Sequence, residues 1–511
     1  MVRCVKAFLI LVGMGVAFVV FLDAMNGHHQ RISIANRLVA SETEGSATSK
    51  VDPLAILDEW PEPDLLLTLS GRQHGYIEPC GCTGLENAKG GLSRRHNLFR
   101  RLEKGNWSLL KLDVGNQVRR FGRQAEIKFH TTIDCLRLMK YDVIGFGPDD
   151  LRLSFNELLS ELANSDKEFV CANVSLLGIN SSFRIFDTGG RRIGVTAMLG
   201  QQARQKINNS EIEMKDTDES LQKAVRDLRE AKADVLVLLA HADLEETRQL
   251  AKKFSDFDLI VTAGGAGEPT LHPEIVQGTN TQIIQVGTKG MYVGIVGLYA
   301  DKNRPVRYAR VELDARFEDS PEILEIFANY QYQLQVHGFD GLGIKPVKHP
   351  RSDRTFVGSE SCGECHTSAY DIWKKTPHFD ATRYIHDPTE RSEIPRHFDP
   401  ECISCHVTGW NPQEYLPYVS GYESFEASTL LHGNGCENCH GPGSAHVAAE
   451  NGDIDVSEAE KEKLQLEMRL TLDQAKNKLC FECHDFDNSP DFNEEGAFEE
   501  YWDQIKHYGT E

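Results

Sequence analysis

Four short cysteine motifs near the C-terminal end constrain this chain more than any other feature. Each has the pattern Cys-x-x-Cys-His, and all four fall within 123 residues, at intervals of 40, 34 and 44 residues. Two cysteines at this spacing can form thioethers to the two vinyl groups of one porphyrin, and the histidine after them can bind its iron. Zinc bound by paired cysteines is the alternative, but it does not explain why a histidine follows every pair. The sequence therefore predicts four covalently bound haem c groups, held by Cys362, Cys365 and His366; Cys402, Cys405 and His406; Cys436, Cys439 and His440; and Cys480, Cys483 and His484.

The size and charge of the chain limit the classes to which it can belong. At 511 residues it is too long for one ordinary core, so two or three domains are expected. Its formal net charge of -22 argues against nucleic acid as a partner, because phosphate binding needs clustered Lys and Arg. The same charge is compatible with docking to a basic redox partner, although acidic solubility explains it equally well.

The N-terminal segment predicts export. Arg3 and Lys6 precede an apolar run at residues 7–22, which is long for a signal-peptide core and short for a span of about twenty residues. A cleaved signal and an uncleaved membrane anchor both fit, and the positive flank would stay in the cytoplasm. We therefore expect residues 1–25 to be a signal peptide or membrane anchor and residues 26–63 a tether. The rest of the chain would then lie on the periplasmic side of the cytoplasmic membrane.

Short apolar runs alternate with amphipathic stretches over residues 64–315. Strands separated by helices indicate an α/β domain, in which ligands bind beyond the C-terminal ends of the strands. Strands are expected at residues 65–69, 108–113, 143–146, 169–172, 193–198, 235–239, 259–261, 281–286 and 294–299, with helices at residues 220–231 and 245–254.

The loops of this domain resemble those of the metallophosphoesterase domain of the 5′-nucleotidase family. The resemblance implies an α/β metallophosphoesterase-like sandwich that carries two metal ions on Asp-x-His, Gly-Asp, Gly-Asn-His, a lone His and Gly-His-x-His. His74 and His241 match histidines of that set, but Arg72 replaces a metal-binding Asp and Asn116 replaces the bridging Asp. The third loop has lost its Asn-His, and the last loop has lost both histidines.

These departures predict a degenerate domain in which phosphatase activity is lost. Two metal ions need anionic and imidazole ligands, and together they generate the hydroxide nucleophile. One hypothesis is that Arg72, His74 and His241 still bind an anion without turning it over. The simpler alternative is that Arg72 pairs with a nearby carboxylate such as Asp113.

The next loop holds Cys80 and Cys82, whose role the sequence leaves open. They could be metal ligands, a redox pair, or halves of disulfides to Cys135 and Cys171. For an exported domain, disulfides or buried inert cysteines are the simplest interpretation.

The second domain is expected at residues 355–511, after a helix and linker at residues 316–354. Four haems leave about forty residues for each, so the porphyrins should supply much of the core of a mostly α-helical, loop-rich multihaem c-type cytochrome domain. The second axial ligand of each iron decides between electron transfer and ligand binding. The remaining histidines of this region are His378, His386, His397, His432, His446 and His507.

The flanks of the motifs resemble the cytochrome c554 family over essentially this whole domain. The matching stretches are residues 357–360, 373–378, 398–401, 405–409, 436–446 and 501–507. Members of that family are periplasmic electron carriers with four haems, most of them bis-histidine and one with a vacant position. The resemblance implies His378, His446 and His507 as distal ligands, with His386, His397 and His432 as weaker candidates for a fourth.

The leading hypothesis is an exported tetrahaem electron carrier, tethered to the membrane through residues 7–22, that passes electrons between redox partner proteins. Its phosphoesterase-like domain would serve docking or anion binding. The alternative is an enzyme, acting either on a small nitrogen or oxygen species at an open haem or as a phosphoesterase with an unusual metal site. A pure interaction role for the N-terminal domain is a third possibility.

Overall fold

The computed structural model describes residues 51–79, 88–105, 107–301, 303, 306–351, 353–387, 393–485 and 488–508. The chain divides into two compact units, Met1–Val51 and Asp52–Glu511, and every element described below belongs to the second. The predicted segment at residues 7–22 lies outside the described residues, as do Cys80 and Cys82. Among the residues that are described, no helix is both long and apolar enough to cross a membrane.

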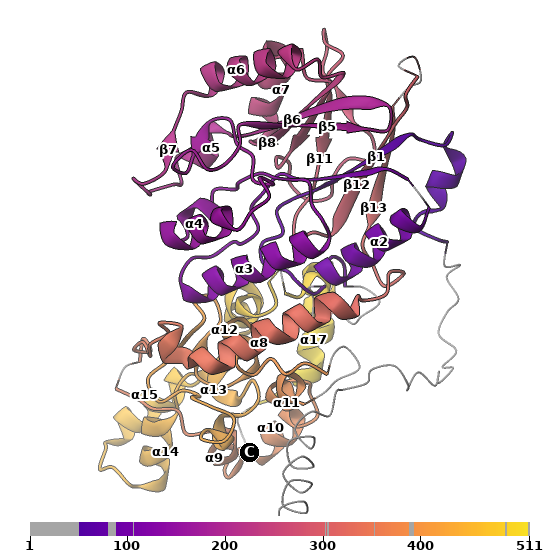
Figure 1. Cartoon of the computed structure of the whole chain (residues 1–511). Helices are drawn as coiled ribbons and strands as arrows, with labels where there is room; N and C mark the ends of the chain where they lie inside the picture. Colours follow the sequence, from indigo (N-terminus) through magenta and orange to yellow (C-terminus); the bar gives the residue numbers. More distant parts are fainter. Residues whose placement is uncertain are drawn as a thin grey trace, which may run out of the picture. The chain divides into compact units, whose positions relative to one another are not determined.

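Two β-sheets form the centre of the α/β region (Figure 1). The first has the order β13-β12-β1-β2-β3 and the second the order β10-β11-β9-β8-β6-β5. Strands β1, β2 and β3 run parallel, whereas β12 is antiparallel to β1. The first sheet comprises β1 (Leu65–Ser70), β2 (Leu109–Asp113), β3 (Val143–Ile144), β12 (Tyr292–Leu298) and β13 (Arg307–Glu312). The second comprises β5 (Phe183–Thr188), β6 (Arg191–Leu199), β8 (Val235–His241), β9 (Leu259–Thr262), β10 (Glu274–Ile275) and β11 (Gln282–Gln285).

Side chains that alternate along each strand join the two sheets and their helices into four layers. In β1, Leu65 and Leu67 pack between the sheets with Val237 of β8, while Leu66 faces the helices outside the first sheet. Strand β8 does the same on the other side, because Leu236 packs against the outer helices. Both faces of each central strand are therefore covered, which explains their continuous apolar sequences.

Helices cover the outer face of each sheet (Figure 1). Capping side chains fix where several begin: the Ile323 N–H donates to the Ser320 hydroxyl at the start of α8, where Pro321 is the first helical residue. Over the first sheet lie α2 (Leu92–Lys104), α3 (Arg123–Leu138) and α8 (Pro321–Gly341), and over the second lie α6 (Thr217–Glu230) and α7 (Leu244–Lys253). Two shorter helices are α4 (Phe155–Ala163) and α5 (Gln201–Arg204), and β4 (Val174–Ser175) pairs with β7 (Glu213–Met214).

One strand prediction was wrong, and other strands, including β5 and β13, were missed. Residues 169–172 form no strand, since they make only isolated bridges from Phe169 to Ile144 and from Val170 to Ser181. Strand β5 was missed because it is a half-buried edge strand whose polar residues, such as Arg184 and Asp187, interrupt the apolar pattern.

The region of the haem motifs is mostly helical and has little apolar core of its own. Its main cluster of buried apolar side chains has only six members, among them Ile403 and Trp410. The helices are α9 (Ser359–Gly363), α10 (Thr367–Trp373), α11 (Ala381–His386), α12 (Pro400–His406), α13 (Cys436–His440), α14 (Ser444–Asn451), α15 (Glu458–Glu467), α16 (Leu472–Gln474) and α17 (Ala497–Ile505), with one short hairpin of β14 (Trp410–Asn411) and β15 (Leu416–Pro417).

Candidate haem sites and the loops of the α/β region

Each cysteine motif lies on one short turn of helix. The His366 N–H donates to the Cys362 carbonyl at 2.9 Å, and the His484 N–H donates to the Cys480 carbonyl at 2.8 Å. The second and third motifs lie in α12 and α13. A helical turn brings residues three and four positions apart onto one face, so both thiols and the imidazole can reach one porphyrin.

Three motif histidines each have a second histidine opposite them. An imidazole nitrogen binds a first-row metal at about 2 Å, so two imidazoles on opposite sides of one ion have ring centroids about 6 Å apart. The observed spacings therefore fit an iron atom between the rings. The centroid distances are 6.3 Å for His366 and His446, 6.0 Å for His378 and His484, and 5.8 Å for His440 and His507.

Backbone carbonyls orient several of these rings. The Nδ1 atom of His440 lies 2.6 Å from the Met468 carbonyl oxygen, and the Nδ1 atom of His507 lies 2.8 Å from that of Ile505. A bond at Nδ1 fixes the tautomer and leaves Nε2 for a metal. The residues present therefore fit haem c at these positions.

His406 of the second motif is different. Its Nδ1 atom lies 2.7 Å from the Ala381 carbonyl oxygen, but no other histidine ring in the described part of the chain is placed opposite it. The three weaker candidates gather around Phe425 instead. The ring centroid of Phe425 lies 3.6 Å from that of His386 and 4.5 Å from that of His432, and His386 and His397 are 4.5 Å apart.

The sulfur atoms place the motifs in a spatial order that differs from their order in the chain. Neighbouring thiols link the first motif to the third, the third to the fourth, and the fourth to the second. Cys362 hydrogen-bonds to Cys436, Cys439 lies close to Cys480, and Cys483 hydrogen-bonds to Cys405.

Arg72 binds the loop that would carry the last two metal-binding histidines. Its Nη1 donates to the carbonyl oxygens of Ala263 at 3.1 Å and Gly265 at 3.3 Å. The expected pair with Asp113 is wrong, because that carboxylate lies 3.8 Å from the fully buried guanidinium of Arg95. Arg72 thus joins two loops at the place expected for a metal ion.

His241 lies beside Arg72 at the end of β8. Burial, and then the charge of Arg72, lower the pKa of His241 to about 4. Its Nδ1 atom is buried and has no hydrogen-bond partner among the described residues. His74 follows β1 and contacts the Thr288 hydroxyl at 3.2 Å, so the structure brings Arg72 and His241 together and places His74 elsewhere in the same loop.

The carboxylates of the third loop hold the second loop. Asp150 accepts the backbone N–H groups of Asn116 and Gln117, each at 2.7 Å, and Asp149 accepts the Asn116 side-chain amide at 2.9 Å. Arg72 and Asn116 have φ values of 50° and 68°, which are rare and costly for residues other than glycine. Within the described ranges, no three His, Cys, Asp or Glu side chains are grouped so that they could hold a metal ion.

Cys135 and Cys171 are free thiols, and both are buried. Burial raises the pKa of the Cys171 thiol to about 11, so it is protonated and inert at neutral pH.

Helix α12, which carries the second motif, packs against α3 and α8 of the α/β region. The Lys128 Nζ lies 2.7 Å from the Glu401 carboxylate. The side-chain amides of Gln124 and Gln331 donate to Asp399 at 2.7 and 3.1 Å. These polar contacts fix the N-terminal end of α12.

Further contacts between the two regions come from loops. Arg396 donates to both carboxylate oxygens of Glu78, at 2.8 and 2.6 Å, and the Arg120 guanidinium stacks on the Tyr415 ring at 3.6 Å. Sequence reasoning predicted none of these contacts. The Asp399-Pro400 pair was a visible helix-start signal, but nothing in the pattern pointed to its partners.

Comparisons with known proteins match the two regions separately. Residues 361–441 match the family Cytochrome c554 and c-prime. Cytochrome c-554 of Nitrosomonas europaea is 30% identical over 102 residues, which cover 18% of this chain and 40% of the relative. Apyrase of Aedes albopictus is 22% identical over 306 residues (53% of this chain, 54% of the relative), and snake venom 5′-nucleotidase of Naja atra is 22% identical over 294 residues (51% and 55%).

Among solved structures, the 5′-nucleotidase precursor of Thermus thermophilus is similar at 21% identity, with 53% of this chain and 59% of that one covered and a TM-score of 0.47. The chain spans about half the length, or less, of the curated relatives that it matches. Both resemblances and the predicted fold classes are confirmed. The chain joins a C-terminal region that matches the Cytochrome c554 and c-prime family over residues 361–441 to an N-terminal region similar in sequence to apyrases and 5′-nucleotidases.

Proposed function

We propose that this protein is an exported tetrahaem electron carrier, tethered through residues 7–22 and working between redox partner proteins on the periplasmic side of the cytoplasmic membrane. The observation that carries the proposal is the set of three opposed histidine pairs at centroid distances of 5.8 to 6.3 Å. Two imidazoles on one iron leave no open position, which favours electron transfer over ligand binding.

The residues would divide the work as follows. The motif cysteines would hold the porphyrins covalently, and the motif histidines would bind the irons. His446, His378 and His507, which lie opposite the histidines of the first, fourth and third motifs, would supply the second iron ligands. When bound, each haem c takes up and releases one electron at its iron.

The neighbouring thiols support a serial route through the motifs in the order first, third, fourth and second. The chain holds the four attachment sites close together, so that each site has a neighbour. The α/β region covers the second motif through α3 and α8, which leaves the first motif, with its exposed Cys365, as the accessible end of the series.

The α/β region has the role of a degenerate domain in this proposal. Arg72 occupies the position of a metal-binding Asp and bonds backbone carbonyls, and Asn116 is bonded to Asp149. The buried Nδ1 of His241 beside Arg72 supports binding of an anion without turnover. A phosphoesterase with an unusual metal site would need ligands beyond those grouped in the described ranges.

A second function rests on His406. Since no histidine of the described part faces it, the second motif could present an iron with an open position, where a small nitrogen or oxygen species could bind and react.

One preparation of the full chain tests the proposal. The pyridine haemochrome assay should give four haems per chain, and dithionite should reduce all four reversibly. Fewer than four haems, or bound zinc in their place, would contradict it. Carbon monoxide added to the reduced protein should bind at most one haem, at the second motif. Slow turnover of nitrite or hydroxylamine by the reduced protein would favour the enzyme instead.

A further inference from the structure

Arg354, which precedes the first motif, is a buried cation whose hydrogen-bond donors are only partly used. Its side chain is 7% exposed, and its Nη2 donates to the Glu467 carboxylate. Its Nε and Nη1 atoms are buried and have no hydrogen-bond acceptor in the ranges that the structure describes. The Asp353 carboxylate lies 3.9 Å from Nε, which is too far for a hydrogen bond. Burying such donors without an acceptor is costly, so an acceptor from outside the polypeptide would stabilise this site.

A second guanidinium group, that of Arg351, lies near the first. Burial, and then the charge of Arg354, lower the pKa of Arg351. The Arg351 Nη1 donates to the His440 carbonyl oxygen at 2.8 Å. Glu467 compensates one of the two positive charges, and the Asp353 side chain is 78% exposed to solvent. Positive charge therefore remains on the buried side of the two arginines.

The two arginines adjoin the first and third haem sites. Next to Arg354, the Thr355 N–H donates to the Ser444 hydroxyl at 2.9 Å, and the Ser444 N–H donates to the Thr355 carbonyl oxygen at 3.2 Å. Ser444 begins α14, which carries His446, the residue opposite His366. Arg354 is close enough to the His446 ring for its charge to act on that ring. Haem c carries propionate side chains, so carboxylates of the first and third haems would lie in this part of the molecule.

We propose that Arg354, together with Arg351, binds a propionate carboxylate of the haem at the first or third motif. The inference rests on the proposed function for the presence of haem. The fork of N–H donors on a guanidinium group matches the two oxygens of a carboxylate, which would satisfy the donors that the chain leaves unpaired. A positive charge stabilises the reduced, less positive state of a nearby iron. Arg354 is thus a positioning residue that raises the midpoint potential of that haem.

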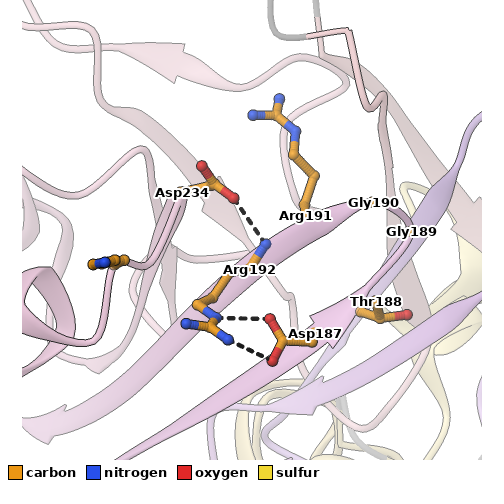
Figure 2. Close-up of a pocket in the computed structure, with 8 residues that line it drawn as sticks. Asp187, Thr188, Gly189, Gly190, Arg191, Arg192 and Asp234 are labelled. Atoms are coloured by element: carbon orange, nitrogen blue, oxygen red, sulfur yellow. Dashed lines mark hydrogen bonds and ion pairs between the residues drawn. The ribbon is translucent and has the colours of Figure 1, made fainter.

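Arg192 provides a matched control, because every nitrogen of its guanidinium group has a partner within the chain. Its Nε and Nη2 donate to the Asp187 carboxylate at 2.7 and 2.9 Å (Figure 2), and its Nη1 donates to the Ala231 carbonyl oxygen at 3.1 Å. It lines a cavity of about 590 Å³ at the hairpin of β5 and β6, in the second sheet of the α/β region. Arg192→Gln therefore removes the same charge as Arg354→Gln, at a place that is not beside a haem motif.

The test is spectroelectrochemical titration of the haem-loaded full chain and its variants at several pH values, with resonance Raman spectra of the propionate bending bands. Arg354→Gln should lower the midpoint potential of at least one haem by about 59 mV, a tenfold change in its reduction equilibrium, and should shift a propionate band. The propionate would lose its guanidinium partner, so its pKa should rise and the lowered potential should fall further as the pH rises. Glu467→Gln removes the other partner of Arg354 and should lower no potential, and Arg192→Gln should change none.

Native potentials in Arg354→Gln, or an equal shift in Arg192→Gln, would overturn the inference. So would added acetate that shifts the potentials of the native protein but not those of Arg354→Gln, since a free anion would then occupy the site. If Arg354→Gln does not fold, Arg354→Lys keeps the charge without the fork, and an unshifted propionate band in that variant would overturn the inference as well.

The inference and the proposed function fail separately. If the chain carries four reducible haems and the loss of Arg354 changes no potential, the propionate site is wrong and the electron-carrier function stands. If the chain carries no haem, the function itself fails.

Discussion

The Glu437 carboxylate accepts the backbone N–H of Gly358 at 2.7 Å, and this bond ties the third motif to the segment before the first. Glu437 is only 2% exposed, and it also accepts the N–H groups of Val357 at 3.0 Å and Gly443 at 2.8 Å. Next to it, Asn438 accepts the N–H of Gly409, beyond the second motif, at 2.9 Å. The two variable residues of the third motif thus hold the first and second motifs in place.

Substitution of Glu437 should therefore destabilise the haem-motif region. Glu437→Gln replaces a carboxylate that accepts three N–H groups by an amide whose NH₂ end repels them, at a cost of about 2 kcal/mol or more. Urea unfolding of the haem-loaded chain measures the change. Glu364→Gln, at an exposed position of the first motif, is the matched control and should have little effect. Equal stability of both variants would contradict the role assigned to Glu437.

Removal of a distal histidine should open one iron. His446→Ala leaves His366 without a facing ring, so one haem should become high-spin and bind carbon monoxide when reduced. The visible spectrum of the reduced protein, recorded with and without carbon monoxide, measures this.

The control for that experiment is His432→Ala. His432 contacts Phe425 rather than a motif histidine, so its loss should leave the spin state unchanged. The pairing is wrong if the His432 variant becomes high-spin and the His446 variant does not.

The ion pair between the buried Lys128 and the partly buried Glu401 should hold the second motif against the α/β region. Lys128→Met leaves Glu401 poorly paired, which should cost about 3 kcal/mol of unfolding free energy. Lys223→Met removes an exposed pair with Asp227 and should cost about 0.5 kcal/mol or less. Calorimetry of both variants measures the free energy of unfolding. Similar losses of unfolding free energy in the two variants would show that the ion pair at the interface contributes little.

His130 on α3 should make stability depend on pH. Hydrogen bonds to Glu161 and Glu157 raise the pKa of His130 above its ordinary 6.5 although burial opposes them. Burial acts to raise the pKa of Glu161, but the bond from His130 and the charge of Arg137 outweigh it, and this pKa falls below 4.5.

The signs define a pH window. The raised pKa of His130 contributes stability that is fully present below pH 6.5 and is lost as the pH rises through the folded-state pKa. The lowered pKa of Glu161 contributes stability that is present above pH 4.5 and is lost as the pH falls through the folded-state pKa. The difference in Tm between the native protein and His130→Gln should thus be greatest between about pH 4.5 and 6.5. A difference that does not vary with pH would refute this assignment.

The four motifs could be recognised in the sequence, whereas the contacts between distant residues could not. Each motif is complete within five residues, so its cysteines and histidine can be identified from spacing alone as predicted attachment residues. The pairing of the histidine rings follows no spacing. His446 lies six residues after His440 yet faces His366, and His378 lies twelve residues after His366 yet faces His484.

The same limit applies in the α/β region. The continuous apolar runs of β1 and β8 were recognisable because both faces of these strands are buried. The partners of Arg72 could not be recognised in the same way. Ala263 and Gly265 accept its hydrogen bonds through backbone carbonyls, which every residue type has, so the sequence does not identify them.

The spin states of the four irons test the central claim most directly. Electron paramagnetic resonance of the oxidised full chain, with integrated intensities, should show low-spin signals from three haems with two imidazole ligands and a high-spin signal from one. No haem iron signal, or high-spin iron at the sites of His366, His440 and His484, would contradict the account.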